Sequence, residues 1–465
     1  MIQGLSARVN HLKKDKVPIS LLITPLNLIK INGIIQFQEG FMSTPNSISR
    51  LLPRKRLLPL LVAALVLGPQ TASAIDLGTA FAMAKNNDPK FQAAKAEMDA
   101  TKSQSVRDWT SYAPTYTFSR QQLPTLNTTN RTQTVNQPLF DLAKASTVMQ
   151  GSSRNTLASA AFDVQAQDLA TRTVNAVNQI VVATEAIKAN AGQIAALESQ
   201  YKGAKRKFEL GQGTVTDLLD VEVKFQQAKA NDLTLRANLK GARDSFTAIV
   251  GEKPGDMDFM LPNKHETFKI DLLDEILARA EKNNPNVVVA KSNERIAQLD
   301  VSKAAGAVAP TVGYTYSKTQ YNAVTNENNG LTLTIPIDIG SYIGTYTALA
   351  KSKQSSSVRL QTETQIKVEA QRLFELVQAG QESLKIKGQA VETAQKSVIA
   401  NQKSYEAGVK STTDVLIAIQ TLYQTRNEYA LAATQQATQL LNLLLVGAED
   451  VDNAVLRTQA FLFRK

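Results

Sequence analysis

The sequence contains an internal duplication, which limits its possible folds more than any other feature. Three prolines of the first half recur in the second half at separations of 196, 196 and 198 residues, and one glycine and one aspartate recur at 197. The pairs are Pro89/Pro285, Pro114/Pro310, Pro138/Pro336, Gly211/Gly408 and Asp217/Asp414. Because five landmarks keep almost one separation, we predict two structural repeats, 75–269 and 270–465, the second with a short C-terminal tail.

Two long stretches of the chain contain no proline, a residue that breaks helix interiors. No proline lies between Pro138 and Pro254 or after Pro336. Both stretches are rich in Ala, Gln, Lys, Leu and Glu, which favour helices. A helix over 141–208 would be about 100 Å long at 1.5 Å per residue. This length exceeds that of a compact domain and predicts a coiled-coil bundle.

Apolar residues after the first glycine recur in steps of three and four, as in a coiled coil. The seam, with one polar exception at Asp232, consists of Leu218, Val221, Phe225, Ala228, Leu235, Leu239, Ala242, Phe246 and Ile249. The helix after Asp414 keeps the pattern only weakly, which suggests that the two helix pairs have different neighbours. Each repeat is thus predicted to contain a helix, a strand pair, a long helix, a turn and a returning helix.

Residues 42–74 have the three parts of a secretory signal peptide. A basic segment ends at Arg56, an apolar run of 11 residues covers 57–67, and Ala72-Ser73-Ala74 forms a cleavage site. The run is too short to cross a bilayer as a helix, which needs roughly 20 residues. We expect the mature chain to begin at Ile75, residues 1–41 to be an extra N-terminal extension, and no helix to span a membrane. The lack of cysteine argues against a lipid anchor.

Alternating aromatic and β-branched residues predict strands at 112–119, 312–316 and 331–338. The segments 124–131 and 321–330 are rich in Asn and Thr and are predicted to be loops. A two-stranded hairpin is marginal alone and leaves exposed edges. The hairpins could cap a soluble helical bundle, or several subunits could close them into a membrane barrel. The signal peptide favours the barrel.

The composition is poorly suited to catalysis. The chain has no cysteine and only two histidines, His11 and His265, whereas imidazole is the usual general base and a common metal ligand. No catalytic carboxylate pair or phosphate-binding glycine loop is recognisable. We therefore expect no enzyme activity, no cofactor and no metal site. The formal charge of the chain is +11, but without residues 1–74 only 43 basic and 39 acidic residues remain. The charges also alternate in sign along the helices, so no nucleic-acid partner is expected.

Four short motifs recur in the same order in both halves. They are Ile75-Asp76-Leu77 with Asn86-Asn87-Asp88-Pro89, Ala113-Pro114-Thr115, Gln137-Pro138-Leu139-Phe140-Asp141 and Phe208-Glu209-Leu210-Gly211, each with its counterpart about 196 residues on. Because these motifs occur in this order and at this spacing, the chain resembles TolC-type outer-membrane efflux proteins over residues 75–447. The resemblance implies a mixed, mainly α fold with a long antiparallel coiled-coil helical barrel. It also implies two β-hairpins that give four strands to the twelve-stranded transmembrane β-barrel of a homotrimer.

The same resemblance implies a passive export channel in the cell outer membrane of a Gram-negative bacterium, with a long periplasmic portion. Its partners would be outer-membrane lipid, a periplasmic adaptor (membrane fusion protein) and an inner-membrane ABC or RND-type transporter. The cargo would be that of type I protein secretion, multidrug efflux or both. The alternative is a soluble periplasmic coiled-coil scaffold or adaptor, which accounts for the helices and signal peptide but not for the duplicated hairpins.

The resemblance further implies roles for residues at the two helical turns. The pore constriction would be formed by Asp414 and Ile417, and a gate latch by Asp217, Tyr405 and Lys410. The adaptor-docking tips would include Leu210, Gly211, Thr216, Gly408, Val409 and Thr413. Ile417 stands where the family has a second acidic ring, which predicts weaker cation selectivity. Lys410 replaces an arginine, which predicts a looser latch because lysine lacks the planar fork.

Two features of these turns follow from the residues themselves. Gly211 and Gly408 suit a chain reversal that requires positive φ. Threonine and aspartate side chains cap helix N-termini, so we expect Thr216/Asp217 and Thr413/Asp414 to cap the returning helices.

Overall fold

A computed structural model describes residues 75–123, 128–255, 259–262, 268–322 and 324–463. The chain divides into two compact units, 1–70 and 71–465, and all described residues belong to the second. The predicted extension 1–41 and signal peptide 42–74 lie outside the described residues.

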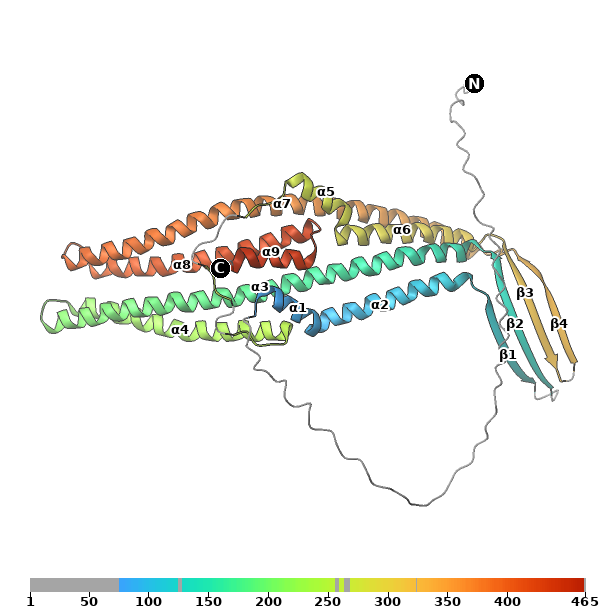
Figure 1. Cartoon of the computed structure of the whole chain (residues 1–465), viewed down its shortest axis with the longest axis horizontal. Coiled ribbons are helices and arrows are strands. Elements are labelled where there is room, and N and C mark those ends of the chain that lie inside the picture. Colours follow the sequence, from blue (N-terminus) through green and yellow to red (C-terminus); the bar gives the residue numbers. More distant parts are fainter. Residues whose placement is uncertain (1–74, 124–127, 256–258, 263–267, 323, 464–465) are drawn as a thin grey trace, which may run out of the picture. The chain divides into compact units, whose positions relative to one another are not determined.

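The two halves follow the same order of elements, as the duplication predicts (Figure 1). The first half contains α1 Leu77–Asn87, α2 Pro89–Trp109, a short 3-10 turn Thr110–Tyr112, β1 Thr115–Leu123, β2 Thr128–Phe140, α3 Leu142–Glu209 and α4 Val215–Val250. The second half contains α5 Leu273–Asn283, α6 Pro285–Gly306, β3 Thr311–Tyr321, β4 Val324–Thr334, α7 Ile339–Glu406 and α8 Thr412–Val446. The C-terminal tail is a further helix, α9 Val451–Phe463.

The repeated sequence motifs mark helix starts. Pro89 and Pro285 occupy the first turns of α2 and α6, where the missing N–H costs nothing. Asp141 caps α3 by accepting a hydrogen bond from the backbone N–H of Lys144. Asp338 caps α7 in the same way, through Gly340 and Ser341. The motifs therefore fix where each helix begins.

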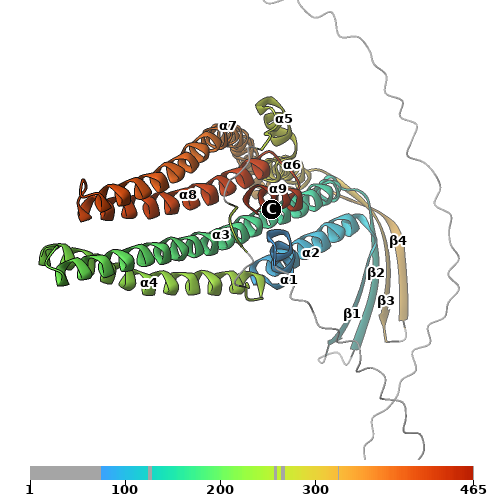
Figure 2. The same cartoon turned by 60° about the vertical axis from the view of Figure 1, so that its left-hand side comes forward.

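The long helices α3 and α7 have 68 residues each, which corresponds to about 100 Å. Helix α3 packs against α4, and α7 against α8, as two antiparallel pairs that Figures 1 and 2 show side by side. The predicted seam of α4 is confirmed, because Val221, Phe225 and Phe246 are buried.

Helix α8 is more buried than its weak heptad pattern predicts. It contacts α3, α7 and α9, so a broad apolar face is covered instead of a narrow seam. Its C-terminal part contributes Leu440, Leu441 and Leu445 to the main core cluster. Helix α9 adds Val455 and Leu462 to the same cluster.

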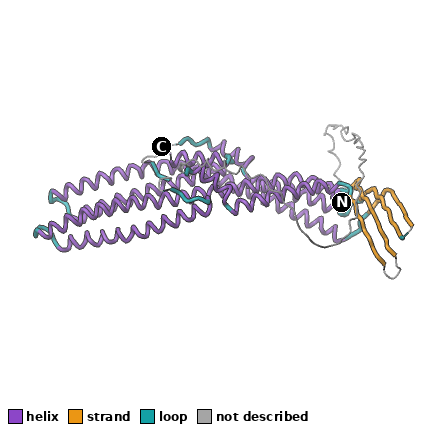
Figure 3. Tube along the Cα trace, turned by 60° about the horizontal axis from the view of Figure 1, so that its bottom comes forward, coloured by secondary structure: helices purple, strands orange, loops and turns teal. Residues whose placement is uncertain are grey.

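The four strands form one antiparallel sheet in the order β1-β2-β3-β4, labelled in Figure 1 and drawn in orange in Figure 3. Pairing of β2 with β3, from Asn130 opposite Tyr321 to Phe140 opposite Val312, joins the two hairpins and hence the two halves.

The predicted strand limits require correction. The segment 321–330, expected to be a loop, lies mostly in β4, because its backbone pairs with β3 and a tight turn at Asn322, with φ of 46°, replaces the loop. Residues 128–131, also expected in a loop, belong to β2. Residues 335–338 follow β4 outside the sheet, and Tyr112 lies in the 3-10 turn that precedes β1.

The register gives the sheet two different faces, because side chains alternate along a strand and paired residues share a face. The first, which we call the apolar face, carries most of the large apolar side chains, and its rows farther from the helices also carry the charged residues Arg120, Arg131, Lys318 and Glu327. Its apolar residues are Tyr116, Phe118, Val135, Val312, Tyr314, Tyr316, Leu331 and Leu333. The second, the polar face, carries mainly small polar side chains, with Leu123, Tyr321 and Val324 in its last rows. Its polar and small residues include Thr115, Thr117, Ser119, Thr132, Thr134, Asn136, Thr315, Ser317, Thr319, Asn326, Asn328, Gly330 and Thr332. Most of the large side chains of the apolar face are exposed in the single chain.

None of the helices in the described part of the chain combines the length and the apolar character that crossing a bilayer requires.

Candidate functional site at the helical turns

The two turns that follow α3 and α7 have the same backbone geometry. Gly211 and Gly408 adopt φ of 71° and 74°, the left-handed conformation that the sequence predicts for them. The N–H of Gly211 donates to the Phe208 carbonyl oxygen at 3.0 Å, and that of Gly408 donates to the Tyr405 oxygen at 3.0 Å. The following residue in each turn donates to a carbonyl five residues back, which is the Schellman arrangement that ends a helix at glycine.

The N-caps of the returning helices are not the threonines expected, although Asp414 takes part in capping α8 as predicted. Thr214, not Thr216, caps α4, and its hydroxyl oxygen accepts from the Asp217 N–H at 3.1 Å. Ser411, not Thr413, caps α8 in a reciprocal capping box with Asp414. The two aspartates occupy the third helical position, where a carboxylate also stabilises the N-terminus. The prediction was wrong by two residues because several Ser and Thr side chains stand close together before each helix.

Asp414 is held in its charged form. The backbone N–H and the hydroxyl of Ser411 donate to its carboxylate at 3.0 Å and 2.8 Å, and the Lys410 ammonium lies 3.6 Å from it. The hydrogen bond from the Ser411 N–H is the largest cause that keeps the pKa of Asp414 below its usual range, and Lys410 adds to it. The second turn therefore presents a stable negative charge that is partly balanced by a neighbouring cation.

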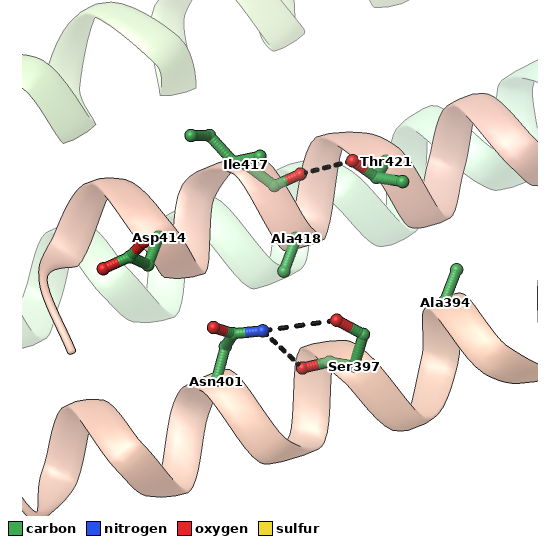
Figure 4. A pocket seen from close by; sticks show the side chains of 7 residues that line it. All are labelled: Ala394, Ser397, Asn401, Asp414, Ile417, Ala418 and Thr421. Atoms are coloured by element: carbon green, nitrogen blue, oxygen red, sulfur yellow. Dashed lines mark hydrogen bonds between the residues drawn. The ribbon is translucent and has the colours of Figure 1, made fainter. Parts of the chain in front are cut away.

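Asp414 and Ile417, the predicted pore-constriction residues, line one pocket between α7 and α8 (Figure 4). Ala418 and Thr421 extend its wall along α8, and Ala394, Ser397 and Asn401 form the α7 side. The Asn401 amide donates to the backbone oxygen and the hydroxyl of Ser397. The side chain of Ile417 is 58 % exposed, so the pocket combines one carboxylate with polar groups and an uncovered apolar side chain.

The structure does not bring the three predicted latch residues together within the chain. Lys410 lies beside Asp414, and the Asp217 carboxylate accepts from the Thr214 hydroxyl at 2.6 Å. Across the described ranges, no hydrogen bond or ion pair joins Asp217 to Tyr405 or Lys410. Tyr405 instead lies under the ammonium of Lys207 on α3, 4.0 Å from the ring centre.

Lys207 is not among the residues that the sequence patterns identify. Its contact with Tyr405 joins the ends of α3 and α7, and the side chains of Gln200 and Gln402 form a hydrogen bond between the same helices. Nearby, Leu416 of α8 packs into the apolar cluster of α3 and α4. No local pattern connects residues about 200 positions apart, so only the folded chain identifies these links.

The outer surfaces of both turns carry exposed apolar side chains. Leu210 is 63 % and Val409 78 % exposed, and Thr216 and Thr413 are exposed beside them. Among the described residues, no group of three or more His, Cys, Asp or Glu side chains could hold a metal ion.

Comparisons with known proteins match both halves. The model of the family described as outer membrane efflux protein matches residues 81–252 and 276–447. The outer membrane protein TolC of Escherichia coli (strain K12) is 23 % identical over 421 residues, which cover 84 % of this chain and 85 % of TolC. The alkaline protease secretion protein AprF of Pseudomonas aeruginosa is 26 % identical over 417 residues, covering 81 % of this chain and 85 % of AprF.

Solved structures share the architecture. The CmeC outer membrane channel of Campylobacter jejuni superposes with a TM-score of 0.68 at 14 % identity, over 90 % of this chain and 99 % of CmeC. The duplicated arrangement of helices and strands thus recurs in a solved outer-membrane channel.

Proposed function

Because the chain belongs to the outer membrane efflux protein family, we propose that it is one subunit of a passive export channel of the Gram-negative outer membrane. The observation that carries this proposal is the sheet with one apolar and one polar face, attached directly to two helices of about 100 Å. The apolar face suits lipid and the polar face suits an aqueous lumen. The helices suit a periplasmic tunnel.

The assembly proposed is a homotrimer. Within the described residues β1 and β4 each have one unpaired edge, and such edges are liable to pair with other chains. Three copies would place twelve strands in a closed barrel with no free edge. The signal peptide would be removed after Ala74, and the mature chain would begin at Ile75.

The proposed partners are a periplasmic adaptor and an inner-membrane ABC or RND-type transporter, which supplies the energy. The exposed tips, with Leu210, Gly211, Thr216, Gly408, Val409 and Thr413, are the proposed docking surface. The relatives include proteins named for the secretion of proteases, which supports type I protein secretion as the cargo route. Multidrug efflux is the second cargo route that we propose.

The proposed entrance is formed by the turn after α7. Three copies of Asp414 would form a carboxylate ring that favours cations, with Ile417 beside it. Asp217, Tyr405 and Lys410 would hold the entrance closed. Because Asp217 and Lys410 are not paired within one chain, the proposed latch contact between them is one between neighbouring subunits.

The proposal is tested with a matched pair of substitutions on β4. Leu331→Arg puts a charge on the apolar face and should abolish flotation with outer membranes and channel activity in planar bilayers. Thr332→Arg puts the same charge on the polar face and should keep both, with altered ion selectivity. A wild-type protein that stays in the soluble periplasmic fraction, or two variants that behave alike, would contradict the proposal and favour a soluble scaffold.

A further inference from the structure

All charged side chains of the described strands lie on the apolar face, in two neighbouring rows. In the first row the Lys318 ammonium lies 2.5 Å from the Glu327 carboxylate on the adjacent strand. In the second row Arg120 of β1 stands directly opposite Arg131 of β2. The polar face, in contrast, carries only uncharged side chains among the described residues of the strands.

The two arginines have no acidic partner among the residues that the structure describes. The Arg131 row continues with Gln320 and Thr325, which carry no charge. Glu327 lies two strands from Arg131 and is already paired with Lys318. Like charges directly opposite each other destabilise a sheet. An anion bound from outside the described chain would therefore stabilise this pair.

The register gives the position of the pair relative to the apolar residues. The row of Gln320 and Arg131 lies eight residues along β3 from the row of Val312 and Leu333. This separation corresponds to a distance of about 27 Å. For strands tilted by about 40°, as in membrane barrels, this is about 20 Å of height, close to the usual apolar band of about 25 Å. Counted from the row of Val312 and Leu333, the arginines therefore lie in the outer part of such a band, beyond the Lys318–Glu327 row, where long side chains can extend to the lipid headgroups.

We infer that Arg120 and Arg131 form a binding site for the phosphate monoester groups of outer-membrane lipids on the outside of the sheet. A phosphate monoester carries close to two negative charges and three acceptor oxygens, and guanidinium groups bind it through paired N–H donors. Two guanidinium groups on neighbouring strands can hold one phosphate between them. The inference rests on the proposed function in one respect, since it takes the apolar face to contact lipid.

The test uses the assembled full-length protein in detergent, titrated with lipid A as the phosphate-bearing probe. Arg120→Gln with Arg131→Gln should raise the apparent Kd about 30-fold, which corresponds to about 1 kcal/mol for each arginine at an anionic lipid surface. Arg120→Lys with Arg131→Lys keeps the charge and should stay within about fivefold of wild type. Arg206→Gln with Arg295→Gln removes the same charge from exposed helical positions and should leave the Kd unchanged.

Two further arms identify the ligand. Dephosphorylated lipid A should bind wild type and the glutamine variant equally, and inorganic phosphate should compete only weakly. Equal lipid A affinity of wild type and the glutamine variant would overturn the inference, as would inorganic phosphate binding as tightly as lipid A. Loss of the oligomer in the glutamine variant, without lipid dependence, would assign the arginines to a subunit contact instead.

Oligomeric state and bilayer conductance are measured on the same samples. A conducting oligomer that is indifferent to lipid phosphate would remove this inference and leave the proposed function intact. A chain that forms no channel would remove the proposed function.

Discussion

The ammonium nitrogen of Lys207 lies 4.0 Å from the centre of the Tyr405 ring. Lys207 stands at the end of α3 and Tyr405 at the end of α7, so the contact joins the two halves beside their turns. A cation over an aromatic face contributes about 0.5 to 1 kcal/mol at an exposed site. It is therefore strong enough to bias the position of the α7–α8 tip without locking it.

Lys207→Ala is expected to favour the open entrance, because it removes the cation that holds Tyr405. A loss of about 0.5 to 1 kcal/mol corresponds to a two- to fivefold shift of the equilibrium between closed and open entrance, measured as a higher open probability in planar bilayers. Tyr405→Phe keeps the ring and should behave as wild type, whereas Tyr405→Ala should match Lys207→Ala. Lys205→Ala, at an exposed position nearby, is the control. A Tyr405→Phe variant that opens the channel would show that the hydroxyl acts instead of the ring.

Asp217→Ala combined with Lys410→Ala is expected to raise single-channel conductance further, because both are proposed to close the entrance between subunits. Lys410→Ala alone should also strengthen cation preference, since it removes the positive charge 3.6 Å from Asp414. Reversal potentials across a salt gradient measure the second effect. Unchanged conductance in the double variant would remove both residues from the proposed latch.

The charge of Asp414 predicts the pH dependence of ion selectivity. Because its pKa in the folded protein is lowered, more than half of the carboxylates remain ionised at the ordinary aspartate pKa of about 3.9. Cation preference should therefore persist as the pH falls toward about 4 and be lost only below the pH at which an ordinary aspartate is half protonated. Asp414→Asn should abolish the preference at every pH, whereas Asp220→Asn, at an exposed position on the first tip, should not. A preference that already declines near pH 6 would point to another titrating group.

The turn glycines can be tested against a helical glycine with equal space around it. A Cβ atom would meet nothing within 4 Å at Gly408 or at Gly241, so only the backbone conformation differs. Gly408→Ala should destabilise the protein by about 1 to 2 kcal/mol, because its φ is positive. Gly241→Ala, inside α4, should stabilise it by about 0.5 to 1 kcal/mol. Thermal unfolding followed by circular dichroism should show opposite shifts in Tm, and a loss at both positions would contradict the conformational explanation.

The sequence predicts the long helices and the turns well, because proline spacing, heptads and glycine act over short distances. It fails for β4, where Asn-rich composition suggests a loop and the actual cause of strand formation is pairing with β3. It also misplaces the helix caps, since Thr214, Thr216, Ser411 and Thr413 differ little in cap preference. The contacts of Tyr405 and the joining of β2 to β3 depend on residues far apart in the chain, so no local signal reveals them.

The pairing of β2 with β3 also determines the order in which the chain can fold. Asn130 and Tyr321 lie 191 residues apart, and closing so long a loop costs conformational entropy before any contact offsets it. The hairpin of β1 and β2 can form as soon as its own residues are available, but β2 keeps a free edge until the second half arrives. A chain truncated after α4 would keep that edge exposed and would be prone to aggregate. Folding of the sheet is therefore a late step that follows synthesis of both halves, and slow assembly is expected to come from this non-local contact and not from the helices.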